Sequence, residues 1–277
     1  MTVRINYVIL IIMIIDFHAH CFPDAIAPKA LPKLAACSGI HSAFTDGTAE
    51  GLLAAMDRAG IDKSVVANIA TNPKQQRSVN SFAISLLEEP RFIPFGSVHP
   101  EAPDALDELR RLKDAGVKGI KLHPDYQEFF PDDPGVFPIY HEIARLGLVT
   151  LFHAGVDIGL CDPVRATPAR LANALPQFEG APVVAAHFGG YILWREVLEH
   201  LCGKDIYFDT SYCARKMPPP WAREIIAAHG AGRILFGTDL PWADPSDEIA
   251  FVRRISADEG MAGEILGENA ERLLGLE

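Results

Sequence analysis

The sequence predicts an α/β protein with the (β/α)₈ architecture of a TIM barrel. Short apolar runs alternate with amphipathic stretches of about three turns, a pattern typical of parallel strands joined by helices. Eight such runs can be counted along the chain, with seven helical stretches between them. The chain has 277 residues, and one barrel of this kind needs roughly 250. Length and count therefore agree on one barrel.

The apolar runs are rich in β-branched residues and are apolar on both faces, as expected of strands that are covered on both sides. An open, doubly wound sheet would give the same local pattern, and the count of eight favours the barrel. In chain order the predicted strands are Ile11–Phe17, Ser64–Ala70, Phe92–Val98, Val117–Leu122, Leu148–Phe152, Pro182–Ala186, Asp205–Phe208 and Arg233–Gly237.

Two of the helical stretches carry clear end signals. The stretch Thr48–Gly60 opens on an N-cap residue and closes on glycine, and Pro103–Ala115 has proline at its start and Gly116 just past its end. Three long connections follow the first, fourth and fifth strands, at 21–46, 123–134 and 154–167. All three are expected on one face of the barrel. The first holds three prolines and is expected to be a loop that covers the barrel mouth.

The N-terminus is interpreted as an extension. Tyr7–Ile15 is a continuous apolar run, but it is shorter than the roughly 20 residues that span a bilayer, and no small-residue cleavage site follows it. Because Met13 is a natural start, residues 1–12 are expected to be an upstream extension, or a start-site artefact. Residues 13–277 are then one barrel domain.

The amino-acid composition limits the classes of partner that the protein is expected to bind. The chain holds 25 Lys and Arg against 36 Asp and Glu, a formal charge of −11, whereas nucleic-acid binding demands a basic face. Five cysteines form no C-x-x-C pair, which favours a reducing, cytoplasmic compartment. We expect a small-molecule substrate, with no nucleic acid and no membrane as partner; a homo-oligomer is left open.

Polar residues at strand ends indicate a metal site. His18 and His20 lie two apart on the first strand, so both imidazoles point to the same side. His153, His187 and Asp239 follow the fifth, sixth and eighth strands. The carboxyl ends of barrel strands meet at one mouth, where the chemistry of this fold takes place. Nitrogen and oxygen donors gathered there are typical zinc ligands.

These residues also carry a family resemblance. The landmarks are Asp16–His20, Gly119–Pro124, Phe152–Gly155, Ala186–Gly190 and Phe236–Pro241, together with the terminal stretch Ile265–Leu274. In this order they resemble the amidohydrolase superfamily, in the branch that contains aminocarboxymuconate-semialdehyde decarboxylase and related hydrolases. That branch contains both hydrolases and decarboxylases. The resemblance therefore implies the fold, a (β/α)₈ barrel of the metal-dependent hydrolase type, more specifically than it implies the reaction.

The resemblance implies one divalent metal, zinc before manganese, bound by His18, His20, His153 and Asp239. Asp239 and His187 are then the catalytic residues: Asp239 takes a proton from water that the metal has acidified, and His187 polarises the substrate or protonates the leaving group. Binuclear relatives bridge two metals with a modified lysine on the fourth strand. Lys121 and His187 could serve a second metal in that way, or contact substrate instead; a second metal is the less favoured alternative.

Three further residues are candidates for substrate binding. His123 faces the same way as Lys121, His99 ends the third strand, and Arg165 lies in the loop after the fifth. The favoured function is hydrolysis of an amide, lactone or ester of a small molecule. The alternative is non-oxidative decarboxylation of a carboxylated aromatic or unsaturated acid, for which Arg165 and Lys121 would bind the carboxylate.

Overall fold

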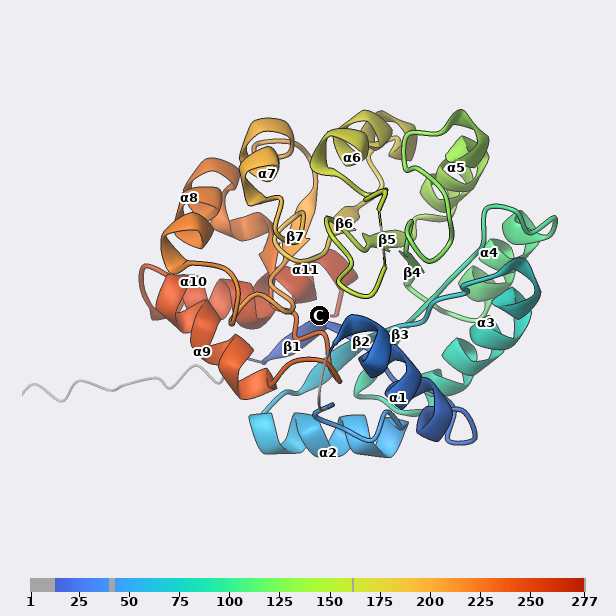
Figure 1. Cartoon of the computed structure of the whole chain (residues 1–277), viewed down its shortest axis with the longest axis horizontal. Helices are drawn as coiled ribbons and strands as arrows, with labels where there is room; N and C mark the ends of the chain where they lie inside the picture. The colour runs from blue at the N-terminus through green and yellow to red at the C-terminus, as the bar shows by residue number, and fades with distance from the viewer. Residues whose placement is uncertain (1–12, 40–42, 161, 277) are drawn as a thin grey trace, which may run out of the picture.

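The computed structural model describes residues 13–39, 43–160 and 162–276. In this part of the chain eight parallel strands pair in chain order from β1 to β8. The ring closes beyond β8, where the Phe17 amide donates to the Phe236 carbonyl at 2.7 Å and Ala19 bridges to Leu240. Helices surround the strands (Figure 1). The predicted (β/α)₈ barrel is confirmed.

All eight predicted strands are present, most of them shorter than their apolar runs. Their bounds are β1 Ile15–Ala19, β2 Lys63–Ala67, β3 Phe92–Gly96, β4 Gly119–Leu122, β5 Val149–Phe152, β6 Val183–Ala185, β7 Tyr207–Asp209 and β8 Ile234–Leu235. The shortest is β8, so Asp239 lies four residues beyond its end rather than directly after it.

The helices cover the outside of the barrel in the expected alternation. They are α1 Ala27–Ser38, α2 Ala49–Ala59, α3 Gln76–Ser85, α4 Ala105–Asp114, α5 Phe137–Leu146, α6 Pro168–Ala174, α7 Trp194–His200, α8 Pro219–His229, α9 Pro245–Ile255, α10 Glu259–Gly263 and α11 Asn269–Leu274. Short 3₁₀ turns lie at Pro73–Gln75, Leu86–Glu88, Pro134–Val136, Leu175–Phe178 and Ala231–Arg233, and a π-helical turn at Glu264–Glu268. The predicted caps of α2 are confirmed: the Thr48 side chain accepts from the Gly51 amide, and Gly60 is left-handed at φ 72°.

The connection 21–46 was wrongly expected to be only a loop, because it contains helix α1. Its prolines do not prevent the helix. Pro28 lies in the first turn, where an amide hydrogen is not needed. Pro32 lies inside the helix at the cost of one backbone hydrogen bond. In the view of Figure 1, helix α1 runs from near the centre of the molecule outward between α2 and α3, and its residues line the cavity described below.

The barrel interior is packed by alternate strand residues. Phe17, Val65, Phe95, Leu151 and Leu235 belong to one buried cluster, which residues of α11 close at the bottom. Gly119 leaves room for this packing, since a Cβ atom there would lie 2.4 Å from the Phe95 ring. A separate, larger cluster fills the space between strands and helices.

A β-bulge in β1 determines where its histidines point. The pairing of β1 with β2 shifts by one residue between Asp16 and Ala19. Phe17 packs inside the barrel, whereas Ala19 packs against the outer helices. Simple alternation from Phe17 would have turned His18 outward. The extra residue reverses the alternation, and His18 and His20 both face the interior mouth.

No helix in the described part of the chain is long and apolar enough to cross a bilayer. The proposed extension, residues 1–12, lies outside the described residues.

Candidate metal centre and active site

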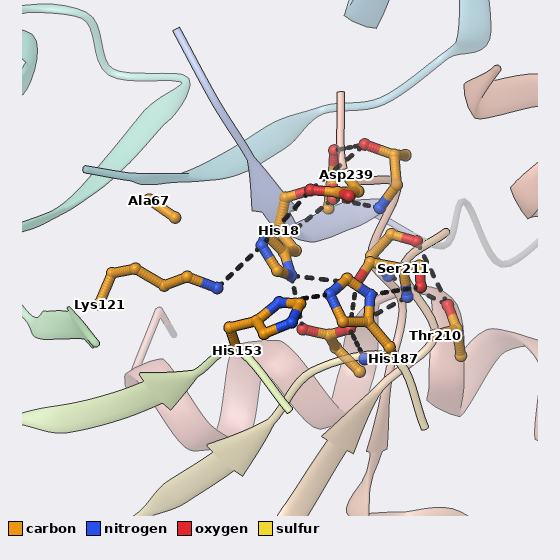
Figure 2. A network of polar contacts seen from close by, with 12 residues as sticks. His18, Ala67, Lys121, His153, His187, Thr210, Ser211 and Asp239 are labelled. Carbon is orange, nitrogen blue, oxygen red and sulfur yellow. Dashed lines mark hydrogen bonds and ion pairs between the residues drawn. The ribbon is translucent and has the colours of Figure 1, made fainter. Parts of the chain in front are cut away.

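The polar residues of the site gather at the carboxyl ends of the strands (Figure 2). His18 belongs to β1 and Lys121 to β4, and Asp209 is the last residue of β7. His153 directly follows β5, and His187 lies two residues beyond β6. The barrel therefore brings together groups that are up to 221 positions apart in sequence, as between His18 and Asp239.

Three donors meet at one point. Asp239 Oδ1 lies 3.2 Å from His20 Nε2 and 3.6 Å from His18 Nε2. Two ligands held about 2.0–2.1 Å from one tetrahedral zinc ion lie roughly 3.3 Å apart. These spacings match a shared cation, and His18, His20 and Asp239 form one of the two groups of candidate metal donors among the described residues.

Hydrogen bonds leave the inward nitrogens of both β1 histidines free to act as ligands. His18 Nδ1 lies 2.9 Å from Asp209 Oδ2, and His20 Nδ1 lies 2.7 Å from the Ala67 carbonyl oxygen. Both partners are acceptors, so the proton is on Nδ1 and the lone pair is on Nε2. Such second partners fix the tautomer and orientation of metal-binding histidines. Burial and the Lys121 ammonium group keep the pKa of His18 well below its usual range, so the ring is neutral.

A similar chain of hydrogen bonds frees one nitrogen of His153. His187 Nδ1 donates to the Ser211 carbonyl oxygen at 2.9 Å, so His187 Nε2 accepts. It accepts from His153 Nδ1 at 3.2 Å, which leaves the lone pair of His153 on Nε2. That nitrogen is buried without a hydrogen-bond partner. An orphaned, buried acceptor costs free energy unless it binds a proton donor or a cation, and this supports a metal beside it.

His153 does not, however, lie within the first donor group. Its imidazole stacks on that of His123 at 4.2 Å, and the two histidines form a second donor group with Asp157. His123 Nε2 lies 3.2 Å from Asp157 Oδ2. The structure thus brings three of the four predicted metal ligands together and places His153 next to them, in contact with His187.

Lys121 points its ammonium group at one of the candidate metal donors. Its ammonium group lies 3.0 Å from His18 Nε2 (Figure 2) and therefore donates to the lone pair that a metal would take. The side chain is buried, and burial lowers the pKa of Lys121 to about 8 despite the opposing charges of Asp209 and Asp239.

Two site residues have unusual backbone geometry. His187 and Asp239 are left-handed, at φ 59° and 65°, a conformation that is uncommon outside glycine and that clusters at functional sites. Hydrogen bonds hold both: the His187 amide donates to Asp209 Oδ1 at 3.0 Å, and the Asp239 amide donates to the His18 carbonyl at 2.7 Å. Burial raises the pKa of Asp239, but the neighbouring imidazoles of His20 and His18 outweigh it and lower the net pKa, so Asp239 is ionised.

These donors lie in a cavity of about 660 Å³. Predicted site residues that line it are His18, His20, Lys121, His123, His153, His187 and Asp239. The other two candidates are not among the lining residues. His99 Nδ1 accepts from the Glu101 amide at 3.2 Å. The Arg165 guanidinium lies over the Phe130 ring, 5.9 Å from its centroid. Both groups make protein contacts instead.

Sequence reasoning missed Asp209, Ser211 and Asp157. The signal for Asp209 was available, because it is the first polar residue at the end of the seventh strand, the position that singled out the other site residues. It directly follows the predicted strand Asp205–Phe208, as His153 directly follows the predicted fifth strand. Asp157 carried no such signal, since it lies inside a long loop.

Comparison with known proteins agrees with this geometry. The family profile described as Amidohydrolase matches residues 15–276. The chain belongs to the amidohydrolase family. A curated relative, 4-sulfomuconolactone hydrolase from Rhizobium radiobacter, is 24% identical, and the match covers 94% of this chain and 89% of the relative.

Solved structures share the fold at low identity. The 5-carboxyvanillate decarboxylase from Sphingomonas paucimobilis superposes with a TM-score of 0.70 at 15% identity, covering 95% of this chain and 99% of that one. A dihydroxybenzoic acid decarboxylase from Polaromonas sp., solved with manganese and 2-nitroresorcinol, gives 0.69 at 18%, covering 95% and 97%. The family profile thus establishes the family, and these structures share the fold. The choice between hydrolysis and decarboxylation has to be argued from the residues of the site.

Proposed function

We propose that this amidohydrolase is a metal-dependent hydrolase that uses activated water on an amide, lactone or ester bond of a small molecule. The observation that carries the proposal is the charge of the cavity wall. Among the described residues lining the cavity there is no arginine, and the innermost cation, Lys121, is hydrogen-bonded to His18. A fixed, bidentate clamp for a substrate carboxylate is therefore missing from this lining, whereas a neutral carbonyl needs none.

We propose His18, His20, Asp239 and His153 as the ligands of one divalent metal. The first three already point their donors at one position, and His153 offers a buried nitrogen without a partner. The mixed nitrogen and oxygen set suits zinc, and manganese is the alternative because it is named with a decarboxylase of the same fold. A second metal held by Lys121 and His187 is less favoured, since Lys121 donates to a ligand of the first.

The protein's own residues provide proton transfer and orientation. When bound, a divalent cation supplies Lewis acidity, which makes water more acidic and polarises a carbonyl group. Asp239 is ionised among the metal donors and can accept a proton from water. His187, with Nδ1 tied to the Ser211 carbonyl oxygen, can take up a proton on Nε2 in exchange for the hydrogen bond from His153 and pass it to the leaving group. Asp209 orients both His18 and His187, because its two oxygens contact one of them each.

The reaction can be tested with a panel of neutral lactones, esters and amides beside carboxylated aromatic acids. We expect turnover of the neutral panel, loss of that turnover in Asp239→Asn, and no release of carbon dioxide. Carbon dioxide from an aromatic acid, with no turnover of the neutral panel, would contradict hydrolysis.

Decarboxylation is the second candidate, and one observation favours it. Lys121 is a buried ammonium group inside the cavity, and a substrate carboxylate could replace its contact with His18. Structural neighbours of the chain are decarboxylases. In this case Lys121→Met should abolish carbon dioxide release while the metal content stays near one equivalent; under the hydrolase proposal the same variant should keep ester turnover.

We also propose a small-molecule substrate as the partner and the cytoplasm as the location. Cys21, Cys37, Cys202 and Cys213 are free thiols, which supports a reducing compartment.

A further inference from the structure

Exposed apolar side chains concentrate at the mouth of the cavity. Among the described residues, five large hydrophobic side chains are conspicuously exposed, and three of them line this cavity: Ile26 (51% exposed), Ile158 (42%) and Leu160 (38%). The other two, Leu87 and Ile192, are not among its lining residues. Single exposed apolar residues are ordinary on protein surfaces, but a group of them around one opening marks a binding surface.

These residues come from two segments on one side of the cavity. The N-cap residue of α1, Ile26, and the α1 residues Ala30, Leu34 and Cys37 all line the cavity, and their spacing of three or four residues puts them on one helix face. The loop after β5 adds Ile158 and Leu160.

The other wall of the cavity is mixed. The segment after β2 and helix α3 contribute the apolar residues Ile69, Val79 and Phe82 and the uncharged polar residues Asn68, Thr71, Gln75 and Ser78. Beyond the metal donors, the charged lining residues are Lys33 and Asp157, one of each sign, besides the inner Lys121. The outer cavity therefore selects neither an anionic nor a cationic tail, and its apolar rim offers hydrophobic contact.

We propose that this outer cavity is a subsite for an apolar tail, so that the substrate is a neutral lactone or ester with an aliphatic or aromatic group of several carbons attached near its carbonyl. This inference rests on the proposed hydrolase function and specifies its substrate class. The volume of the cavity also leaves room for such a tail. At roughly 30 Å³ for each non-hydrogen atom, a cavity of 660 Å³ holds about twenty atoms, whereas a small lactone ring has about six.

A ligand explains the apolar rim better than a protein or membrane partner. Ile26, Ile158 and Leu160 line a cavity that also contains His18, His20 and Asp239, so a tail held by the rim can extend from a carbonyl at the metal donors. A protein or membrane partner would not need this continuity with the catalytic groups.

The test separates binding from turnover. The metal-loaded protein is titrated with 2-alkylcyclopentanones, which resemble lactones but have no bond to hydrolyse, with alkyl chains from methyl to octyl. Binding is followed by tryptophan fluorescence, because Trp242 lines the cavity. We expect Kd to fall about fourfold for each of the first few methylene groups, the effect of burying one such group. γ-Lactones with the same chains are assayed in parallel for turnover.

The double variant Ile26→Ser/Ile158→Ser should reduce the gain to less than about twofold per methylene group. The matched control, Ile192→Ser, changes an equally exposed isoleucine outside the cavity and should keep the parental gain. A Kd that does not depend on chain length, or an equal gain in both variants, would overturn the subsite. Chain-dependent ketone binding without turnover of any lactone or ester would support the subsite and overturn the hydrolase proposal instead.

Discussion

Asp209→Asn is expected to weaken metal binding although Asp209 is not itself a proposed ligand. Asp209 is fully buried, and its Oδ1 accepts hydrogen bonds from the backbone amides of His187 and Ser211, both at 3.0 Å. In asparagine the side-chain oxygen must stay at this position to satisfy the two amides. The NH₂ group then takes the place of Oδ2, which faces His18 Nδ1 at 2.9 Å.

This replacement inverts the tautomer of His18. Facing a donor, His18 Nδ1 must accept, so the ring proton moves to Nε2, the nitrogen that points at Asp239. A protonated Nε2 cannot bind a metal. Loss of such a second partner costs 10- to 100-fold in metal affinity. Because here the tautomer is also inverted, we expect the upper end, about 100-fold, which corresponds to about 2.8 kcal/mol.

Metal affinity can be measured by competition with a chromophoric zinc chelator at pH 7.5, with circular dichroism to verify folding. The matched control is Asp125→Asn, the same substitution at another buried carboxylate. Asp125 Oδ1 accepts from the Arg165 amide at 2.9 Å, and Oδ2 has no hydrogen-bond partner, so this variant should bind metal like the parent. If folded Asp209→Asn bound zinc within threefold of the parent, the reasoning about the tautomer would be refuted.

Three further predictions concern the metal and the histidines. Chelation should abolish activity and, relative to protein with metal at 1,000 times its Kd, lower the free energy of unfolding by about 4 kcal/mol; a chelated protein that keeps its activity and Tm contradicts the metal site. His187→Asn, assayed at saturating metal because His187 also orients His153, should lower kcat by about 10²- to 10⁴-fold, and activity within tenfold of the parent would remove His187 from the mechanism. Burial, followed by the Lys121 charge, keeps the pKa of His123 well below 6.5, so only the unfolded chain takes up this proton, and stability is lost as the pH falls below 6.5. Urea denaturation of metal-free protein between pH 6.5 and about 5.5 should therefore be less pH-dependent in His123→Gln, by about 1 kcal/mol over this interval; an unchanged dependence would show that His123 titrates in the folded state.

The architecture could be predicted from the sequence because it rests on local, repeated signals. Each strand is an apolar run covered on both faces, and each connection contains a stretch with helical spacing. The rule that barrel strands present their carboxyl ends at one mouth then selected His18, His153 and His187 before any coordinates. Asp209 obeys the same rule, because it directly follows the predicted strand Asp205–Phe208, and it was overlooked although the signal was present.

Other features depended on contacts between distant segments. The bulge that turns His18 inward follows from the pairing of β1 with β2, and helix α1 forms in a segment whose prolines had suggested a loop. The hydrogen-bond partners of the metal donors were also known only from the structure. For example, His187 and Ser211, which are distant in sequence, determine which nitrogen of His153 is free. Residue type and periodicity determined which groups reach the barrel mouth. Only the tertiary structure decided the direction of each lone pair, because a tautomer is chosen by whichever donor or acceptor the fold places beside the ring.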